Sequence, residues 1–147
     1  MKTLRILMIE DVEADFLLIA RHLRTHGVLA APYWVQGEPE LTAALDAGGW
    51  DLVLSDYKVP GLAFDQVLER IKARLPHVPV ILVSGSIGEE TAVDLFRKGL
   101  TDFVLKDRRV RLVPAIERGL REETEKKKRR EAENRFKSLI DHANSAI

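Results

Sequence analysis

The chain has 147 residues, of which 46% are hydrophobic and 31% are charged, and its formal net charge is zero. This length supports one compact domain with a core and is too short for two ordinary domains. The balanced charge gives no general reason to expect nucleic acid or an anionic membrane as a partner, and the absence of cysteine excludes disulfides and thiolate zinc sites. No apolar stretch approaches the roughly 20 residues that cross a bilayer. We therefore expect a cytoplasmic domain without membrane contact.

Short apolar runs alternate with amphipathic stretches along most of the chain. The apolar runs predict strands over residues 4–9, 29–35, 52–54, 80–83 and 101–105. The stretches between and after them repeat apolar residues every three or four positions, which predicts helices over 16–26, 38–47, 64–75, 89–98 and from Val110 or Pro114 onward. Such alternation favours a parallel sheet that helices cover on both faces.

The last two of these helices are expected to bury particular side chains. In the helix over 89–98, the buried face should consist of Ala92, Val93, Leu95 and Phe96. In the final helix, the apolar spacing predicts a core stripe of Val113, Ile116 and Leu120.

Polar side chains follow four of the predicted strands at their carboxyl ends. They are the pair Glu10 and Asp11 after the first strand, Asp56 after the third, Ser84 after the fourth and Lys106 after the fifth. In open parallel sheets, ligands bind just outside the carboxyl ends of the strands. The shared placement therefore predicts one functional site at this edge of the sheet.

The residue types at this edge indicate phosphoryl chemistry. Three neighbouring carboxylates repel one another unless a cation lies among them, and oxygen ligands at a partly open site suit Mg²⁺. Glu10, Asp11 and Asp56 are therefore candidate metal ligands. We expect Asp56 to accept a phosphoryl group, because the metal would neutralise the two anions that this reaction brings together. The ammonium of Lys106 and the hydroxyl of Ser84 would contact phosphoryl oxygens.

This pattern resembles the receiver domain of two-component response regulators over residues 4–120. The resemblance rests on the acidic pair Glu10-Asp11, the acceptor position Asp56, the turn Pro60-Gly61, the hydroxyl position Ser84 and the lysine position Lys106. It implies a flavodoxin-like α/β fold, a doubly wound five-stranded parallel sheet of order 2-1-3-4-5, here with an extended C-terminal helix. It also implies that a histidine kinase or a histidine phosphotransfer protein donates the phosphoryl group, with Mg²⁺ as cofactor.

The resemblance further implies a role for each acidic residue. Asp11 and Asp56 would bind the metal directly, and Glu10 would act through a water molecule. The backbone carbonyl of Lys58 would supply another protein ligand.

The chain departs from the usual family pattern at several positions. Asp107 follows Lys106 where the family usually has a proline with a cis bond, and a cis bond without proline costs roughly 3 kcal/mol. Phe103 stands at the position of the rotating switch aromatic but lacks the hydroxyl of a tyrosine, so any switch that it forms with Ser84 must work by packing. Ser84 replaces the commoner threonine, and Glu10 replaces the commoner aspartate.

The C-terminal part of the chain has a different character. Residues 121–131 contain no apolar side chain, which indicates a solvated helix or linker. We predict a receiver domain over 1–121, a helical linker over 122–134 and the truncated start of a following domain over 135–147. Residues 133–140 resemble the entry helix of a PAS sensor domain, which would make the parent protein a hybrid histidine kinase or a cyclase.

The sequence leaves the association state of the chain open. A homodimer could form through the C-terminal helix, or through the face made by the fourth helix, the fifth strand and the last helix, although residues 121–131 lack the apolar seam of a coiled coil. No helix-turn-helix pattern follows the receiver region, so we expect no contact with nucleic acid.

Two other functions fit parts of the sequence. A degenerate receiver would serve only for docking or dimerisation, and the Lys106-Asp107 pair keeps this alternative open. A phosphohydrolase with an aspartate nucleophile is less well supported, because Lys58 stands where its signature requires a second acid. By itself, a receiver domain would catalyse only its own phosphorylation and dephosphorylation.

Overall fold

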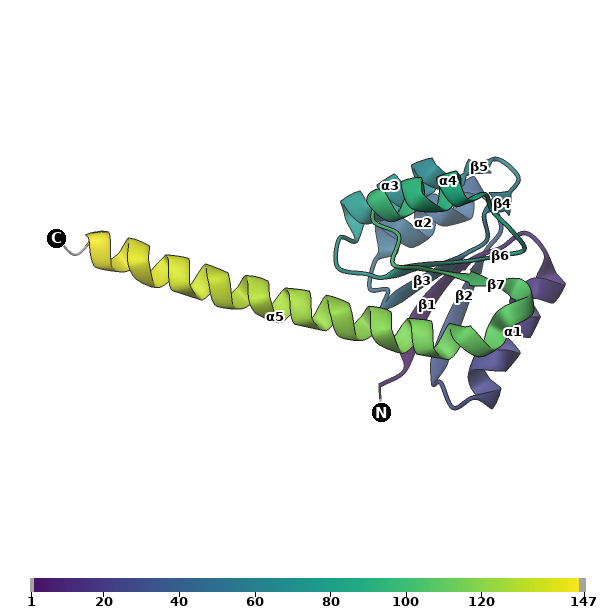
Figure 1. Cartoon of the computed structure of the whole chain (residues 1–147), viewed down its shortest axis with the longest axis horizontal. Coiled ribbons are helices and arrows are strands. Elements are labelled where there is room, and N and C mark those ends of the chain that lie inside the picture. Colours follow the sequence, from purple (N-terminus) through teal and green to yellow (C-terminus); the bar gives the residue numbers. More distant parts are fainter. Residues whose placement is uncertain (1, 146–147) are drawn as a thin grey trace.

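The computed structural model describes residues 2–145 and contains a five-stranded parallel sheet in the order β2-β1-β3-β6-β7. The strands are β1 (Leu4–Ile9), β2 (Ala30–Val35), β3 (Leu52–Ser55), β6 (Val80–Ser84) and β7 (Asp102–Leu105). The helices are α1 (Glu13–Thr25), α2 (Glu38–Ala47), α3 (Phe64–Arg74), α4 (Glu89–Arg97) and α5 (Leu112–Ser145). Figure 1 shows α2, α3 and α4 on one face of the sheet and α1 and α5 on the other. The predicted doubly wound α/β fold is confirmed.

The strands are buried on both faces, so successive side chains enter two separate cores. Leu7 and Val53 belong to the core beneath α2, α3 and α4. Ile6 and Leu54, their neighbours along the chain, belong to the core beneath α1 and α5. The continuous apolar runs of the sequence follow from this double burial, and they leave the polar residues for the strand ends.

Two short elements near the carboxyl edge of the sheet were not predicted. At the expected turn Pro60-Gly61, residues Lys58–Val59 (β4) and Leu62–Ala63 (β5) form a two-stranded antiparallel hairpin. Gly61 has a φ of 81°, a left-handed conformation that favours glycine. A 3₁₀ helix over Lys106–Arg111 (η1) connects β7 to α5. Elements this short carry no detectable periodicity, which explains why the sequence did not predict them.

Helix α4 buries less of its surface than its sequence predicted. Leu95 is buried, but Val93 is 50% exposed and Phe96 is 44% exposed. The prediction that Val93 and Phe96 lie in the core is therefore wrong. Only one narrow stripe of this nine-residue helix packs on the core, so the apolar residues beside that stripe remain at the surface.

Helix α5 begins as a core helix and continues as an exposed one. Leu112, Ala115 and Ile116 are buried against the sheet. Gly119 lies so close to the sheet that an added Cβ would come within 3.1 Å of Thr101 and 3.3 Å of Pro79. Beyond this point the helix still contacts the globular part where Arg130 lies against His77, and its far end stands clear of the domain in Figure 1.

The predicted linker over 122–134 and the residues predicted to open a PAS-like domain form, up to Ser145, one helix with the receiver's last helix. The final two residues of that prediction lie outside the described part of the chain. On the exposed stretch, Phe136, Leu139 and Ile140 have exposed fractions of 66%, 70% and 45%. Within residues 2–145, no helix combines the length and hydrophobicity that crossing a bilayer requires.

Candidate functional site

The ends of two neighbouring strands bring three carboxylates together. Strands β1 and β3 pair in parallel with Ile9 opposite Ser55, so the next residues, Glu10 and Asp56, leave the sheet side by side. The Asp56 amide donates to the Ile9 carbonyl at 2.9 Å, which continues the ladder by one more bond. Each of Glu10, Asp11 and Asp56 has an oxygen within 4.8 Å of an oxygen on the other two.

The Lys106 ammonium lies among these acids. Its Nζ is 2.9 Å from Asp56 Oδ2 and 3.2 Å from Glu10 Oε2. The shortest of its contacts, 2.7 Å, joins it to Asp15 Oδ2. Asp15 lies in the first turn of α1 and was missed by the sequence analysis. The available signal was its place in the first turn of the helix that follows Asp11, since that turn begins close to the carboxyl end of β1.

Burial and repulsion make Glu10 a weak acid. Its side chain is only 3% exposed. Burial raises the pKa of Glu10 to about 7, and the nearby Asp56 carboxylate adds to the rise, although the amide of Val12 and the Lys106 ammonium oppose it. Glu10 therefore changes its charge near neutral pH, unlike an ordinary glutamate.

For Lys106, the acidic partners together affect the pKa more strongly than burial does. Burial lowers the pKa of Lys106, but the hydrogen bonds that its ammonium donates to Asp15, Asp56 and Glu10 raise the pKa by more, so the net pKa lies above its ordinary value. Lys106 is thus held as a cation at every pH at which the acids ionise.

Several contacts fix the orientation of the acids. The amide of Tyr57 donates to Asp56 Oδ1 at 2.7 Å, and the amide of Val12 donates to Glu10 Oε1 at 3.1 Å. The indole of Trp34 donates to the Glu10 carbonyl at 2.6 Å and stacks on Phe16 of α1 at 5.2 Å between ring centroids. These contacts connect β2, the loop after β1 and α1 around the acid cluster.

The other predicted site residues surround this cluster at greater distance. Ser84 is buried at the end of β6 and pairs with Leu105, the residue before Lys106. Phe103 is half-buried in β7 and packs on the core beneath α4. All peptide bonds among residues 2–145 are trans, the one between Lys106 and Asp107 included.

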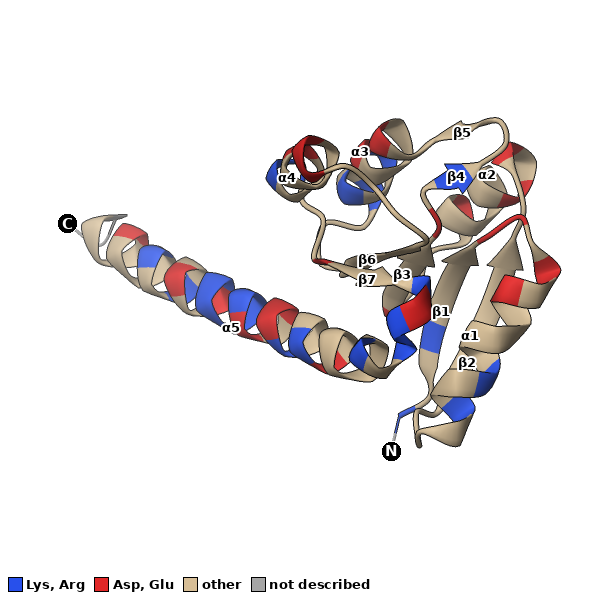
Figure 2. Ribbon diagram, turned by 45° about the vertical axis from the view of Figure 1, so that its right-hand side comes forward, with Lys and Arg blue, Asp and Glu red and all other residues tan. Residues whose placement is uncertain are grey.

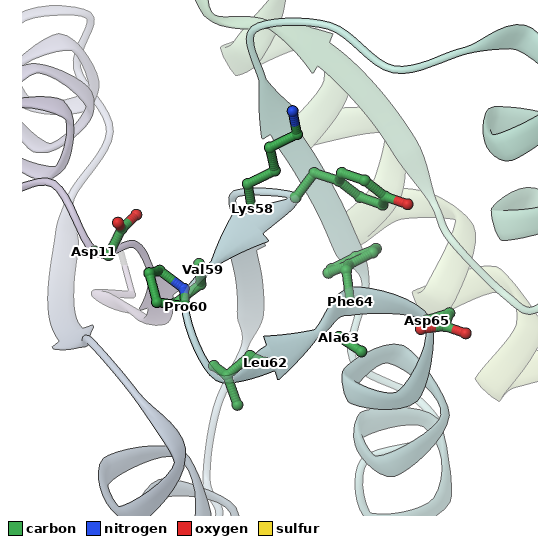
Figure 3. Close-up of a pocket in the computed structure, with 9 residues that line it drawn as sticks. Asp11, Lys58, Val59, Pro60, Leu62, Ala63, Phe64 and Asp65 are labelled. Atoms are coloured by element: carbon green, nitrogen blue, oxygen red, sulfur yellow. The ribbon is translucent and has the colours of Figure 1, made fainter.

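Lys58 belongs to the β4–β5 hairpin, which lies beside the acids. In Figure 3 this hairpin stands between Asp11 and the start of α3. A cavity of about 400 Å³ opens here, lined by residues 57–60, residues 62–65 and Asp11. Of the three clustered acids, Asp11 lines this cavity, so a reacting group in the cavity would lie beside Asp11.

The chemistry of the three acids fits a divalent cation such as Mg²⁺. Their oxygens are close enough to share one ion, and hard oxygen ligands are those that Mg²⁺ prefers. Burial is the main cause of the raised pKa of Glu10, and the nearby Asp56 carboxylate adds to the rise, as expected where acids lie close together. Glu10, Asp11 and Asp56 are the residues that would hold the ion.

The known proteins that this chain resembles in sequence include several bacterial regulators. The chain is 25% identical to the chemotaxis protein CheY-3 of Vibrio cholerae over 109 residues, which are 71% of this chain and 82% of that protein. It is 24% identical to the DNA-binding transcriptional regulator NtrC of Proteus hauseri over 91% of this chain and 28% of that protein. The response regulator FleR of Pseudomonas aeruginosa is 37% identical over 39% of this chain and 12% of its own length. The chain thus spans less than a third of NtrC and FleR.

Solved structures agree with this family. The crystal structure of NtrX from Brucella abortus superposes with a TM-score of 0.80 at 28% identity, covering 91% of this chain and 31% of that one. The crystal structure of the NtrX receiver domain has a TM-score of 0.69 at 32% identity and covers 79% of this chain and 98% of that one. The family model of the response regulator receiver domain matches residues 6–117. The chain therefore belongs to the response regulator receiver domains of two-component signalling systems.

Proposed function

We propose that Asp56 of this receiver domain accepts a phosphoryl group from a histidine kinase or a histidine phosphotransfer protein. One observation supports this proposal above all: the Asp56 carboxylate is held between a lysine ammonium and two further acids at the carboxyl edge of the sheet. Its side chain is 11% exposed, so a small part of it reaches the surface.

In the proposed reaction, an Asp56 oxygen forms a bond to phosphorus while the bond from phosphorus to the donor's imidazole nitrogen breaks. The imidazole leaves with the electron pair of that bond. Asp11 and Asp56 would hold Mg²⁺ directly, Glu10 would act through water, and the Lys58 carbonyl would be a further ligand. When bound, the ion neutralises the negative charge that gathers between carboxylate and phosphoryl group.

Lys106 and Ser84 would stabilise the phosphorylated state. Lys106 donates a hydrogen bond to Asp56 Oδ2 and can transfer it to a phosphoryl oxygen. To do so it must loosen its contact with Asp15, which is the shorter one at 2.7 Å. Ser84 would donate its hydroxyl to another phosphoryl oxygen, and Phe103 would repack in response.

The signal would leave the domain through α4, β7 and α5. Helix α5 connects this face to whatever follows it in the parent protein, which we propose to be a PAS-like domain of a hybrid kinase or cyclase in the cytoplasm. The division into a receiver domain (1–121), a linker (122–134) and a further domain (from 135) is part of the same proposal. Dimerisation could use the α4–β7–α5 face or α5 itself.

The proposal is tested with a small phosphodonor such as acetyl phosphate. Mass spectrometry of the intact chain should show one added phosphoryl group in the presence of Mg²⁺ and none with EDTA. Asp56→Asn should remove the labelling, whereas Asp141→Asn, a control on the exposed part of α5, should keep it. Unchanged labelling of Asp56→Asn would refute the assignment.

A second candidate is a receiver that docks without being phosphorylated. The observation in its favour is the ion pair between Asp15 and Lys106, which opposes movement of the ammonium toward a phosphoryl group. This candidate predicts no labelling of the wild-type chain at any Mg²⁺ concentration. A phosphohydrolase would instead turn over phosphate esters, and it lacks an acid at position 58.

A further inference from the structure

A second cavity lies far from the acid cluster, where the end of α4 meets the exposed part of α5. Its volume is about 560 Å³. The wall is formed by the ends of α3 and α4, the loop that leads to β7 and one side of α5. The lining residues are Lys72, Pro76, Phe96, Arg97, Lys98, Gly99, Leu100, Thr101, Glu122, Glu123, Lys126 and Arg130.

The charge of this lining is unbalanced. Five side chains are cationic and two are carboxylates. Glu123 is 3.5 Å from Lys126 and is thereby partly neutralised, and Glu122 contacts Arg118 outside the cavity at 3.7 Å. Lys98 is paired with Asp94 at 3.3 Å and with Asp65 at 3.9 Å, both outside the cavity lining. Among the described residues, Lys72, Arg97 and Arg130 are the lining cations without an acidic partner, so the cavity attracts anions.

Lys72 is the most constrained of these cations. It is half-buried, and its Nζ donates one hydrogen bond, to the Val78 carbonyl at 3.2 Å. Within residues 2–145 it forms no salt bridge. Burial lowers the pKa of Lys72, which shows that nearby carboxylates do not fully offset the loss of water around this ammonium. An anion in the cavity would supply the missing compensation.

Two arginines face the cavity from opposite sides. Arg97 ends α4, and no ion pair involves it in the described part of the chain. On α5, the Nη1 atom of Arg130 lies 2.7 Å from Nε2 and 2.9 Å from Nδ1 of His77, so its remaining donors stay available. Planar guanidinium groups with several donors are well suited to phosphate oxygens.

An aromatic ring and a hydroxyl complete the lining. Phe96 is 44% exposed and offers an apolar face beside the cations. The Thr101 hydroxyl accepts a hydrogen bond from the Val80 amide at 3.0 Å, which leaves its own proton free for an acceptor. Nucleobases stack on exposed aromatic rings of this kind.

We infer that this cavity binds a nucleotide with two or more phosphates, with the phosphates among Lys72, Arg97, Lys126 and Arg130 and the base on Phe96. This inference is independent of phosphorylation at Asp56. Because the ligand would contact both α4 and α5, it would hold the exposed helix against the domain. The cavity would thus add a second input that acts on the same output helix.

The inference is tested by calorimetry of the full chain with ADP, inorganic pyrophosphate and adenosine, at low salt and in EDTA. EDTA prevents a metal ion from bridging ADP to the acid cluster. We expect ADP to bind most tightly, pyrophosphate less tightly and adenosine least. The double variant Lys126→Gln/Arg130→Gln should raise the ADP dissociation constant at least about tenfold, since two charge-assisted contacts are lost.

The matched control is Lys127→Gln/Arg129→Gln, which removes the same charge from the same helix but from residues outside the cavity. Its affinity for ADP should equal that of the wild-type chain. Arg97→Gln, on the opposite wall, should also weaken ADP binding, and circular dichroism verifies that each variant is folded. The inference is overturned if ADP does not bind, if the control loses as much affinity as the cavity variant, or if pyrophosphate binds as tightly as ADP.

Discussion

The acid cluster and the exposed part of α5 both carry many charges, yet they use them differently. In the cluster, Glu10 and Asp56 are 3% and 11% exposed and share one lysine. Between Arg121 and Glu131 every residue except Thr124 is charged, and nearly all are exposed. Figure 2 shows charges of both signs along α5. Water screens the charges on the helix and is largely absent around the acids.

This difference shows that the contribution of a charge to stability depends more on its burial than on how many charges lie nearby. Ion pairs on an exposed helix are worth about 0.3–0.5 kcal/mol each. A partly buried charge that loses its partner costs several times more. Only the acid cluster should therefore respond strongly to pH, to a metal ion or to a single substitution. The predictions below test this contrast, beginning with the largest effect.

The largest effect concerns Glu10 and pH. Because its pKa is about 7 in the folded chain and about 4.5 when unfolded, the folded state holds its proton more tightly, so stability falls as pH rises between these values. Between pH 5 and pH 8 in EDTA the loss should be about 2.5 kcal/mol. Urea unfolding from pH 5 to pH 8 measures it.

Glu10→Gln is the control for this prediction. Burial and the neighbouring His26 lower the pKa of His22, so His22 makes stability rise with pH over part of the same range. Lys106, whose pKa is raised, keeps its full contribution below its ordinary pKa. The informative quantity is therefore the difference between the wild-type chain and Glu10→Gln. A difference that does not vary with pH would contradict the prediction.

The next effect is that of Lys106. Lys106→Met leaves three carboxylates without their cation and should lower the free energy of unfolding at pH 8 by about 2 kcal/mol, since the lysine is partly exposed. At pH 5 the cost should be smaller, because Glu10 is then protonated. Lys127→Met on the exposed helix should change stability by less than about 0.5 kcal/mol. Equal costs at the two positions would remove the contrast between the regions.

A smaller effect is expected at Asp15, whose carboxylate is 33% exposed. Asp15→Asn keeps the size of the side chain but weakens the contact with Lys106, which should cost about 1 kcal/mol in urea unfolding. If the proposed phosphorylation occurs, the released ammonium should also speed labelling by acetyl phosphate. Asp141→Asn, on the exposed helix, should alter neither measurement.

The smallest effect is expected at Leu139. In a monomer, Leu139→Ala should change the melting temperature little, because the residue is 70% exposed and its burial gives less than about 0.5 kcal/mol. If α5 associates with a second copy, the wild-type melting temperature will rise with protein concentration and the variant will lose this dependence. Melting at two concentrations distinguishes the cases and tests whether this helix is free.

Much of the fold followed from the sequence because the strands are buried on both faces. Their apolar runs stop at the sheet edge, which made Glu10, Asp56 and Lys106 conspicuous. Asp15 was missed because its role depends on how the first turn of α1 faces the lysine. Phe96 was wrongly assigned to the core because helical spacing identifies an apolar face without showing how much of it a neighbour covers.

The close approach of Gly119 to the sheet has a mechanical consequence. The helix rests there on Thr101 and Pro79, and it is anchored nearby where Arg118 donates to the buried Asp102 at 2.7 Å. From Gly119 the helix runs on for about 39 Å to Ser145, and a tilt about Gly119 must also shift the contact between Arg130 and His77. A tilt of the helix by about 5° at Gly119 would therefore displace its far end by about 3 Å. A change too small to disturb the core could thus become an ångström-scale displacement at the far end of the helix.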